Sequence, residues 1–180
     1  MTEDRDRSSV AGRPSSVKSK EYPMSSPRLD EIISRLEKGA RKTNEILSAL
    51  TPEQWQRVVY DDPLVWTVRD LLAHFVSAED SLLKLAQNIA TGGAGLPEDF
   101  DYDAFNAAEQ TRLRNQSPQQ LLTALNAARQ ETVNWARALD DAQLDRIGMH
   151  PVLGEISLET MLVSIYGHQL FHMREAQEKL

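Results

Sequence analysis

The 180-residue sequence contains no cysteine, and this absence removes several kinds of chemistry at once. Disulfide frameworks, thiolate metal sites and cysteine nucleophiles all need a thiol, so none of them operates in this chain. The absence of disulfides is compatible with the cytoplasm, where we expect the protein to be.

Positive charge and long apolar runs are also scarce. The chain has 20 Lys and Arg against 27 Asp and Glu, which gives a net charge of −7 at pH 7. Because nucleic-acid surfaces depend on clustered basic side chains, we expect no nucleic-acid partner. No apolar run approaches the roughly 18–20 residues of a membrane span, and the N-terminus lacks an apolar signal core. We therefore expect neither membrane association nor secretion.

The remaining composition is that of a soluble globular protein, with 26% charged and 41% hydrophobic residues. The length favours one domain with a substantial core. Residues 1–24 contain few apolar side chains and scattered charges, and we predict a disordered tail there. A solvated tail is favoured over a nucleic-acid or membrane arm because its basic residues do not form a block. The folded domain is predicted to cover residues 25–180.

Apolar residues recurring every three or four positions predict four long helices. Their predicted ranges are 26–50, 67–90, 117–139 and 157–179, and each begins at a Ser or Thr that can cap the first turn. Loops are predicted at 60–65 and before the last helix. The glycine-rich segment 92–95 lacks the Lys-Ser/Thr of a phosphate loop, so it is interpreted as a helix stop. Residues 99–111 are ambiguous: 104–114 could be helical, and the aromatic residues near Phe100 could form a loop that lines a substrate pocket or covers the core.

The predicted helices fall into two similar halves. Residues 51–57 and 140–146 both follow a long helix that ends in Ala-Leu, and both precede a loop and another capped helix. This weak internal repeat of two helix pairs predicts an all-α four-helix bundle with pseudo-twofold character, extended by short additional helices.

Three of the four histidines lie on apolar helix faces. His168 and His172 are four residues apart, so they share one face of the last helix. When the caps Thr67 and Ser157 are aligned, His74 stands seven residues after its cap, and the pair stands eleven and fifteen after theirs. Steps of four and seven stay on one helical face. All three imidazoles are therefore predicted to point into the bundle core.

Three imidazoles meeting in the core would form a divalent metal site with His74, His168 and His172 as ligands. The alternative is a set of hydrogen-bonded core histidines without metal. Neutral imidazole suits zinc, nickel, iron or copper, and this ligand set does not choose between them. Three protein ligands would leave a position open for water or substrate, as in catalytic sites. The zinc-protease helix pattern needs Glu where Gln169 stands, so such a peptidase is not expected.

Other polar residues are assigned more ordinary roles. Asp70 has the spacing of a helix-capping residue, which we favour over a role behind a metal ligand. His150 precedes the last helix and is expected to lie at the surface or to pack against its own loop rather than bind metal. Arg57, Arg69 and the aromatic segment near Phe100 are candidates for substrate contact, and no catalytic residue is assigned.

Two motifs resemble the DinB superfamily of metal-binding four-helix proteins. They are residues 66–74, Trp-Thr-Val-Arg-Asp-Leu-Leu-Ala-His, and residues 150–157, His-Pro-Val-Leu-Gly-Glu-Ile-Ser, which lead into His168 and His172. The resemblance covers residues 25–180 and implies an up-down-down-up bundle. It places the family's three metal-ligand positions on His74, His168 and His172, in agreement with the spacing. It also implies a metal-dependent transferase or hydrolase, with a low-molecular-weight thiol such as mycothiol or bacillithiol as cosubstrate in some members.

We therefore expect a metal-dependent enzyme, a thiol S-transferase or a hydrolase that acts on a small molecule. The alternative from another class is a non-catalytic helical bundle that binds a small molecule or a protein partner. A homodimer is compatible with the sequence.

Overall fold

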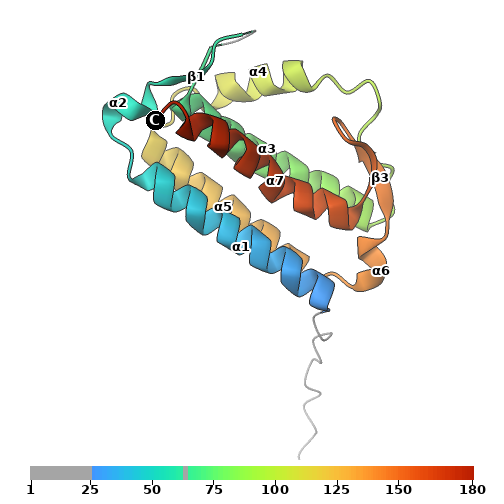
Figure 1. The fold of residues 1–180 in the computed structure, drawn as a ribbon. Helices are drawn as coiled ribbons and strands as arrows, with labels where there is room; N and C mark the ends of the chain where they lie inside the picture. The colour runs from blue at the N-terminus through green and yellow to red at the C-terminus, as the bar shows by residue number, and fades with distance from the viewer. Residues whose placement is uncertain (1–25, 63–64) are drawn as a thin grey trace, which may run out of the picture.

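Four long helices dominate the structure, a computed structural model that describes residues 26–62 and 65–180 (Figure 1). They are α1 (Pro27–Ser48), α3 (Val68–Ala90), α5 (Pro118–Ala136) and α7 (Leu158–Gln177). The predicted all-α bundle is thus confirmed. The predicted tail, residues 1–24, lies outside the described residues, so the domain boundary near residue 25 stays a prediction.

The long helices begin where the sequence predicts, because side chains satisfy the free N–H groups of their first turns. In α3 the Thr67 hydroxyl accepts a hydrogen bond from the Asp70 N–H, and the Asp70 carboxylate accepts one from the Thr67 N–H. This reciprocal arrangement is a capping box, and it confirms the capping role predicted for Asp70. The hydroxyls of Ser26, Ser117 and Ser157 cap the other three helices in the same way, each accepting from the N–H three residues on.

The order of the helices around the bundle follows from their long connections. Helices α1 and α7 run in one direction and α3 and α5 in the other, which is the up-down-down-up arrangement (Figure 1). Each long helix packs against two others, so that α1 and α3 both contact α5 and α7. Helices α3 and α7 are therefore neighbours although about seventy residues separate them. This topology brings the predicted metal ligands to one interface.

Two short hairpins were not predicted: the loop expected before the last helix is wrong, whereas the one expected at 60–65 is interrupted only at Tyr60, because the strands lie on either side of it. One follows α2 (Pro52–Trp55) and pairs β1 (Val58–Tyr60) with β2 (Trp66–Thr67). The other follows α6 (Asp141–Leu144) and pairs β3 (Ile147–His150) with β4 (Gly154–Ser157). Strands of two to four residues are too short for an alternating apolar pattern to stand out.

The two halves of the internal repeat also share an equivalent hydrogen bond where each hairpin meets its long helix. At the start of α3, the Val68 N–H donates to the Arg57 carbonyl at 2.9 Å, and at the start of α7, the Leu158 N–H donates to the Arg146 carbonyl at 2.8 Å. The hairpins lie at opposite ends of the bundle (Figure 1). Each one fixes the start of a helix that carries histidine.

The ambiguous segment forms a helix, α4 (Tyr102–Leu113), which packs on α3. The Gln110 side-chain amide donates to the Asp70 carbonyl at 2.8 Å, and Arg69 donates to the carbonyls of Leu113 and Gln116. These bonds tie α4 to the first turn of α3. None of the helices in the described ranges is both long enough and apolar enough to cross a bilayer.

The core consists of two apolar clusters separated by polar side chains. One cluster includes Leu36 and Ile89, and the other includes Leu47 and Phe75. Between them lie the buried side chains of Glu79, Arg129, Thr132 and Gln169, each at most 4% exposed. On α7, His168 and His172 fall between the segments that form the two clusters, whereas His74 on α3 lies within the segment of the second cluster, next to Phe75.

Candidate metal centre

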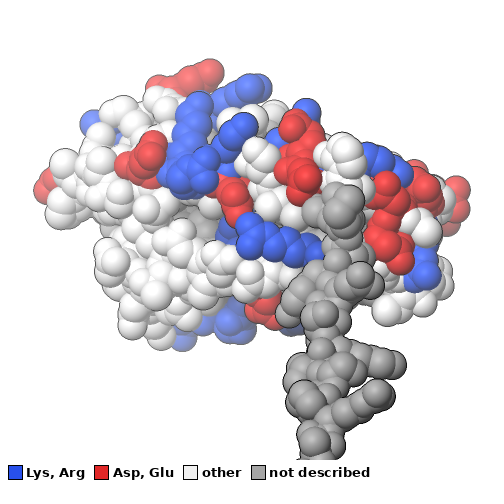
Figure 2. Space-filling model, turned by 90° about the horizontal axis from the view of Figure 1, so that it is seen from below, with Lys and Arg blue, Asp and Glu red and all other residues white. Residues whose placement is uncertain are grey.

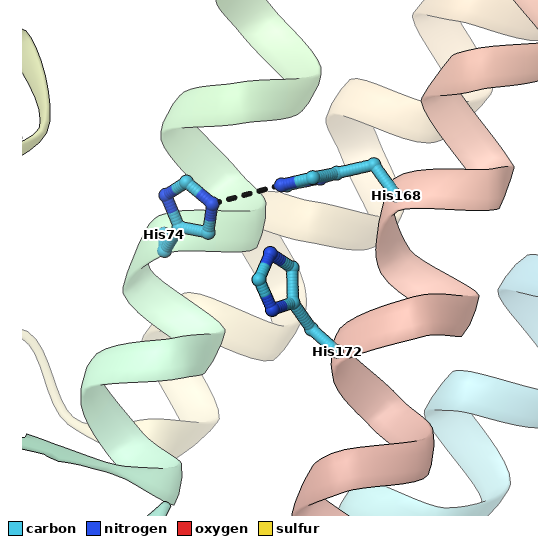
Figure 3. Close-up of side chains that lie close together, drawn as sticks. All are labelled: His74, His168 and His172. Atoms are coloured by element: carbon cyan, nitrogen blue, oxygen red, sulfur yellow. Dashed lines mark hydrogen bonds between the residues drawn. The ribbon is translucent and has the colours of Figure 1, made fainter. Parts of the chain in front are cut away.

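The three histidines predicted to converge do meet between α3 and α7. His74 projects from α3, and His168 and His172 project from α7 toward it (Figure 3). The Nε2 atoms of His74 and His168 are 2.9 Å apart, and the centroids of the His168 and His172 rings are 4.6 Å apart. One nitrogen from each ring lies within 4.8 Å of the other two. Such a group could hold one metal ion.

Aromatic side chains surround the imidazoles. The Trp66 ring lies with its centroid 5.0 Å from that of His74, and Phe75 lies 6.4 Å from His168 and 6.3 Å from His172. His74 is buried, at 8% exposed, while the other two histidines are partly buried. The site therefore has apolar walls, and the strength of electrostatic interactions inside it is greater than in water.

This environment keeps the imidazoles uncharged. Burial, and then the nearby His172, lower the pKa of His74 to about 4. Burial is also the largest cause that lowers the pKa of His168, to about 3, followed by the other histidines. Burial lowers the pKa of His172 too, although Glu175 acts in the opposite direction. Neutral imidazole is the protonation state that metal binding requires.

His74 offers its Nε2, and not its Nδ1, to the cluster. Its Nδ1 is buried, points away from the other two imidazoles (Figure 3) and has no hydrogen bond from a described residue, so it is Nε2 that indicates a ligand. Its Nε2 faces the Nε2 of His168, and two such nitrogens can share only one proton between them. Buried polar atoms are normally paired, at a cost of about 1–3 kcal/mol when they are not. Nitrogen lone pairs directed at a common point are, in contrast, what a cation needs.

Tyr60 and Glu175 stand behind His172, and the sequence analysis identified neither of them. The Tyr60 hydroxyl lies 2.5 Å from the Nδ1 of His172 and also donates a hydrogen bond to the Glu175 carboxylate. Burial, together with that carboxylate, raises the pKa of Tyr60, so its hydroxyl keeps its proton near neutral pH. Glu175 lies three residues after His172 on α7, a spacing that could have drawn attention to it. Tyr60 comes from β1, and no local pattern indicates its role.

The other residues considered from the sequence serve the scaffold. His150 is buried on β3, where its Nδ1 accepts hydrogen bonds from the N–H groups of Val152 and Leu153 at 3.1 Å each. It packs on its own turn, which agrees with the second of the two predicted alternatives and not with a surface position. Arg57 donates to the carbonyls of Lys179 and Leu180 at the chain end. Arg69 is bound by α4, so the hypothesis that these arginines contact substrate gains no support.

The lowered pKa values predict how the metal-free protein responds to acid. Unfolded histidine has a pKa near 6.5, whereas that of His74 in the folded protein is about 4. Between these values the unfolded chain binds a proton that the folded chain does not, so stability is full above about pH 6.5 and falls as the pH drops toward 4. The unfolding free energy lost through protonation of His74 is on the order of 3 kcal/mol. Urea denaturation in chelator should show a clearly weaker pH dependence in His74→Gln, and identical profiles would contradict the assignment.

Solved structures share the fold of this chain at low sequence identity. YfiT from Bacillus subtilis is described as a probable metal-dependent hydrolase with an unusual four-helix bundle topology; its TM-score is 0.69 at 24% identity, over 93% of this chain and 90% of YfiT. A mycothiol-dependent maleylpyruvate isomerase has a TM-score of 0.66 at 16% identity, over 82% of this chain and 60% of the isomerase. No curated protein matches the sequence.

A third structure corrects the expectation that a protein of this kind has no nucleic-acid partner. The colibactin self-resistance protein ClbS was solved in complex with double-stranded DNA. Its TM-score is 0.63 at 15% identity, over 84% of this chain and 96% of ClbS. The fold is thus compatible with such a partner, and the exclusion was wrong. Net charge is a sum over the whole surface and does not describe any one part of it. Figure 2 shows Lys and Arg interspersed with Asp and Glu over one face.

The sequence pattern that defines the DinB superfamily matches residues 35–176. The matched region contains all four long helices except the first turns of α1 and the last residue of α7, and it includes all three converging histidines. The fold and the match agree, and the chain belongs to the DinB superfamily.

Proposed function

We propose that this protein is a metal-dependent enzyme, a thiol S-transferase or a hydrolase that acts on a small molecule. His74, His168 and His172 are the proposed ligands of a divalent cation, with zinc, nickel or iron suited to neutral imidazole. The observation that carries the proposal is the approach of three imidazole nitrogens to within 4.8 Å of one another. A cation held there would supply Lewis acidity, which lowers the pKa of a bound water or thiol toward neutrality.

The residues of this chain supply the conditions for that chemistry. Burial keeps His74 and His168 neutral, so their lone pairs are free at neutral pH. The rings of Trp66 and Phe75 limit the access of water to the imidazoles from the sides that they cover. Three protein ligands leave room in a coordination sphere for a nucleophile or a substrate atom, which distinguishes a catalytic site from a closed structural one.

The structural neighbours support the two reaction classes in the proposal. YfiT is described as a probable metal-dependent hydrolase, and the isomerase depends on mycothiol. The rival hypothesis is a bundle that binds a ligand without turning it over. Both hypotheses accommodate a bound metal, and only the enzyme predicts metal-dependent product formation.

Turnover by the reconstituted protein tests the proposal. The protein loaded with zinc, nickel or iron is assayed with mycothiol, bacillithiol or glutathione and an electrophilic acceptor such as a bimane, and separately with activated esters and amides without thiol. We expect catalysis in one of the two assays that is lost in chelator and in His74→Ala. A thiol conjugate identifies the transferase, and hydrolysis without thiol identifies the hydrolase. Equal rates with and without metal would contradict the proposal.

A further inference from the structure

We propose that Tyr60 and Glu175 are positioning residues that fix the tautomer and the ring orientation of His172, so that its Nε2 is presented to the cation. This inference rests on the function proposed above. It assigns a task to the first hairpin.

The direction of the hydrogen bonds follows from counting protons. The Tyr60 hydroxyl has one proton and contacts two groups, the Nδ1 of His172 at 2.5 Å and the carboxylate of Glu175. An ionised carboxylate can only accept, so the hydroxyl proton goes to Glu175. The hydroxyl oxygen then accepts from His172, which must carry its own proton on Nδ1. The chain of donors therefore runs from His172 through Tyr60 to Glu175.

This proton arrangement leaves the other ring nitrogen of His172 as a bare lone pair. Figure 3 shows one nitrogen of His172 directed toward the gap between His74 and His168, and the other directed away. Because Nδ1 is bonded to Tyr60, the nitrogen that faces the gap is Nε2. Hydrogen bonds of this kind, from the outer nitrogen of a ligating histidine to an acceptor, fix tautomer and orientation in metal sites.

Ring contacts hold Tyr60 in place and connect it to the second helix of the site. Its ring meets that of His172 edge-on, with 5.7 Å between centroids, and that of Trp66 at 6.2 Å. Trp66 in turn lies against His74. Tyr60 and Trp66 are paired across β1 and β2, so one small hairpin contacts a histidine on α7 and a histidine on α3. The arrangement of the hairpin thereby sets both sides of the site.

The internal repeat shows that the hydroxyl of Tyr60 is present in only one of the two equivalent hairpins. Arg57 and Arg146 are equivalent, since each accepts the first N–H of the following helix. Counting three residues onward places Tyr60 opposite Met149, and strand pairing, which shifts within β1, places it opposite Gly148. Neither residue has a hydroxyl to relay a hydrogen bond. A phenol was therefore not needed to build the hairpin itself, and its presence at position 60 is explained by the imidazole that it contacts.

Tyr60→Phe and Glu175→Gln test the proposal, with Tyr166→Phe as the matched control. The control also removes one phenolic hydroxyl that is hydrogen-bonded, here to Arg35 at 2.8 Å, and it lies outside the histidine cluster. Nitrogen-15 NMR of the metal-free proteins reports the tautomer of each histidine. Titration with Zn²⁺ against a competing chelator reports affinity, and urea denaturation verifies that each variant is folded.

We expect His172 to be protonated on Nδ1 in the wild type and in Tyr166→Phe, and to become a mixture of tautomers in Tyr60→Phe. Zn²⁺ affinity should fall about 10- to 100-fold in Tyr60→Phe and Glu175→Gln and remain unchanged in the control. Protonation of His172 on Nε2 in the wild type would overturn the proposal, as would equal Zn²⁺ affinity in Tyr60→Phe and the control. A wild type with the expected tautomer that binds no Zn²⁺ would instead overturn the proposed function, and the positioning role with it.

Discussion

Replacing either His168 or His172 with alanine should abolish stoichiometric metal binding. The wild-type protein is expected to hold one divalent cation per chain, bound through one nitrogen from each of the three converging rings. Loss of a ligand removes a coordinate bond outright, so the affinity should fall by more than the roughly 10- to 100-fold that follows from altering a residue behind a ligand. Elemental analysis of the purified proteins and Zn²⁺ titration against a chelator measure the effect.

His150→Ala is the matched control for this experiment. It removes one buried imidazole whose hydrogen bonds go to its own turn and not to the cluster. The control should retain one equivalent of metal, provided that circular dichroism shows a folded helical protein. Equal metal content in His172→Ala and His150→Ala would contradict the assignment of the ligands.

Replacing Glu79 with glutamine should cost about 3–5 kcal/mol of unfolding free energy. Glu79 is 1% exposed and receives two hydrogen bonds from the Arg129 guanidinium, each 2.7 Å, and one from Thr132 at 2.7 Å. Gln169 donates to it at 3.3 Å, and Arg129 also donates to the Leu36 carbonyl. These groups belong to all four long helices. The variant leaves the Arg129 charge buried and without its partner, which is more costly than the lost bonds alone.

Two further variants distinguish the cost of leaving a charge buried without a partner from the cost of losing hydrogen bonds. Glu31→Gln breaks an exposed ion pair with Arg35 and should change stability far less, because water screens the two charges. The double variant Glu79→Met with Arg129→Met removes both buried charges and should recover much of the loss, because no unpaired ion remains. Urea denaturation curves of the four proteins provide the comparison. If Glu79→Gln were as stable as Glu31→Gln, the buried ion pair of Glu79 and Arg129 would not be what holds the bundle together.

The helices and the meeting of the histidines were predictable because both depend on local periodicity. A capping Ser or Thr fixes where a helix starts, and the count from that cap fixes the direction of every later side chain. His74 and His168 could therefore be assigned to matching faces before any contact was known. The count gives a direction but no distance, and the 2.9 Å approach of their Nε2 atoms depends on how α3 and α7 pack.

The residues that the sequence did not indicate depend on contacts between distant segments. Tyr60 reaches His172 across 112 positions, through a hairpin too short to be recognised from its pattern. Arginine is usually found at the surface, and only the ion pair with Glu79, 50 positions away, explains why Arg129 is buried. Arg69 was a candidate for substrate contact, but its donors are used by carbonyls at the end of α4. In each case the charge or hydroxyl is visible in the sequence and its partner is not.

The central claim, one cation held jointly by three imidazoles, is tested most directly by anomalous diffraction at the metal absorption edge. Crystals of the protein loaded with one equivalent of Zn²⁺ are predicted to show a single strong anomalous peak between α3 and α7. The peak should lie about 2.0–2.1 Å from one nitrogen of each of His74, His168 and His172. A peak elsewhere in the fully loaded protein, or one that leaves any of the three rings unbound, would contradict the account.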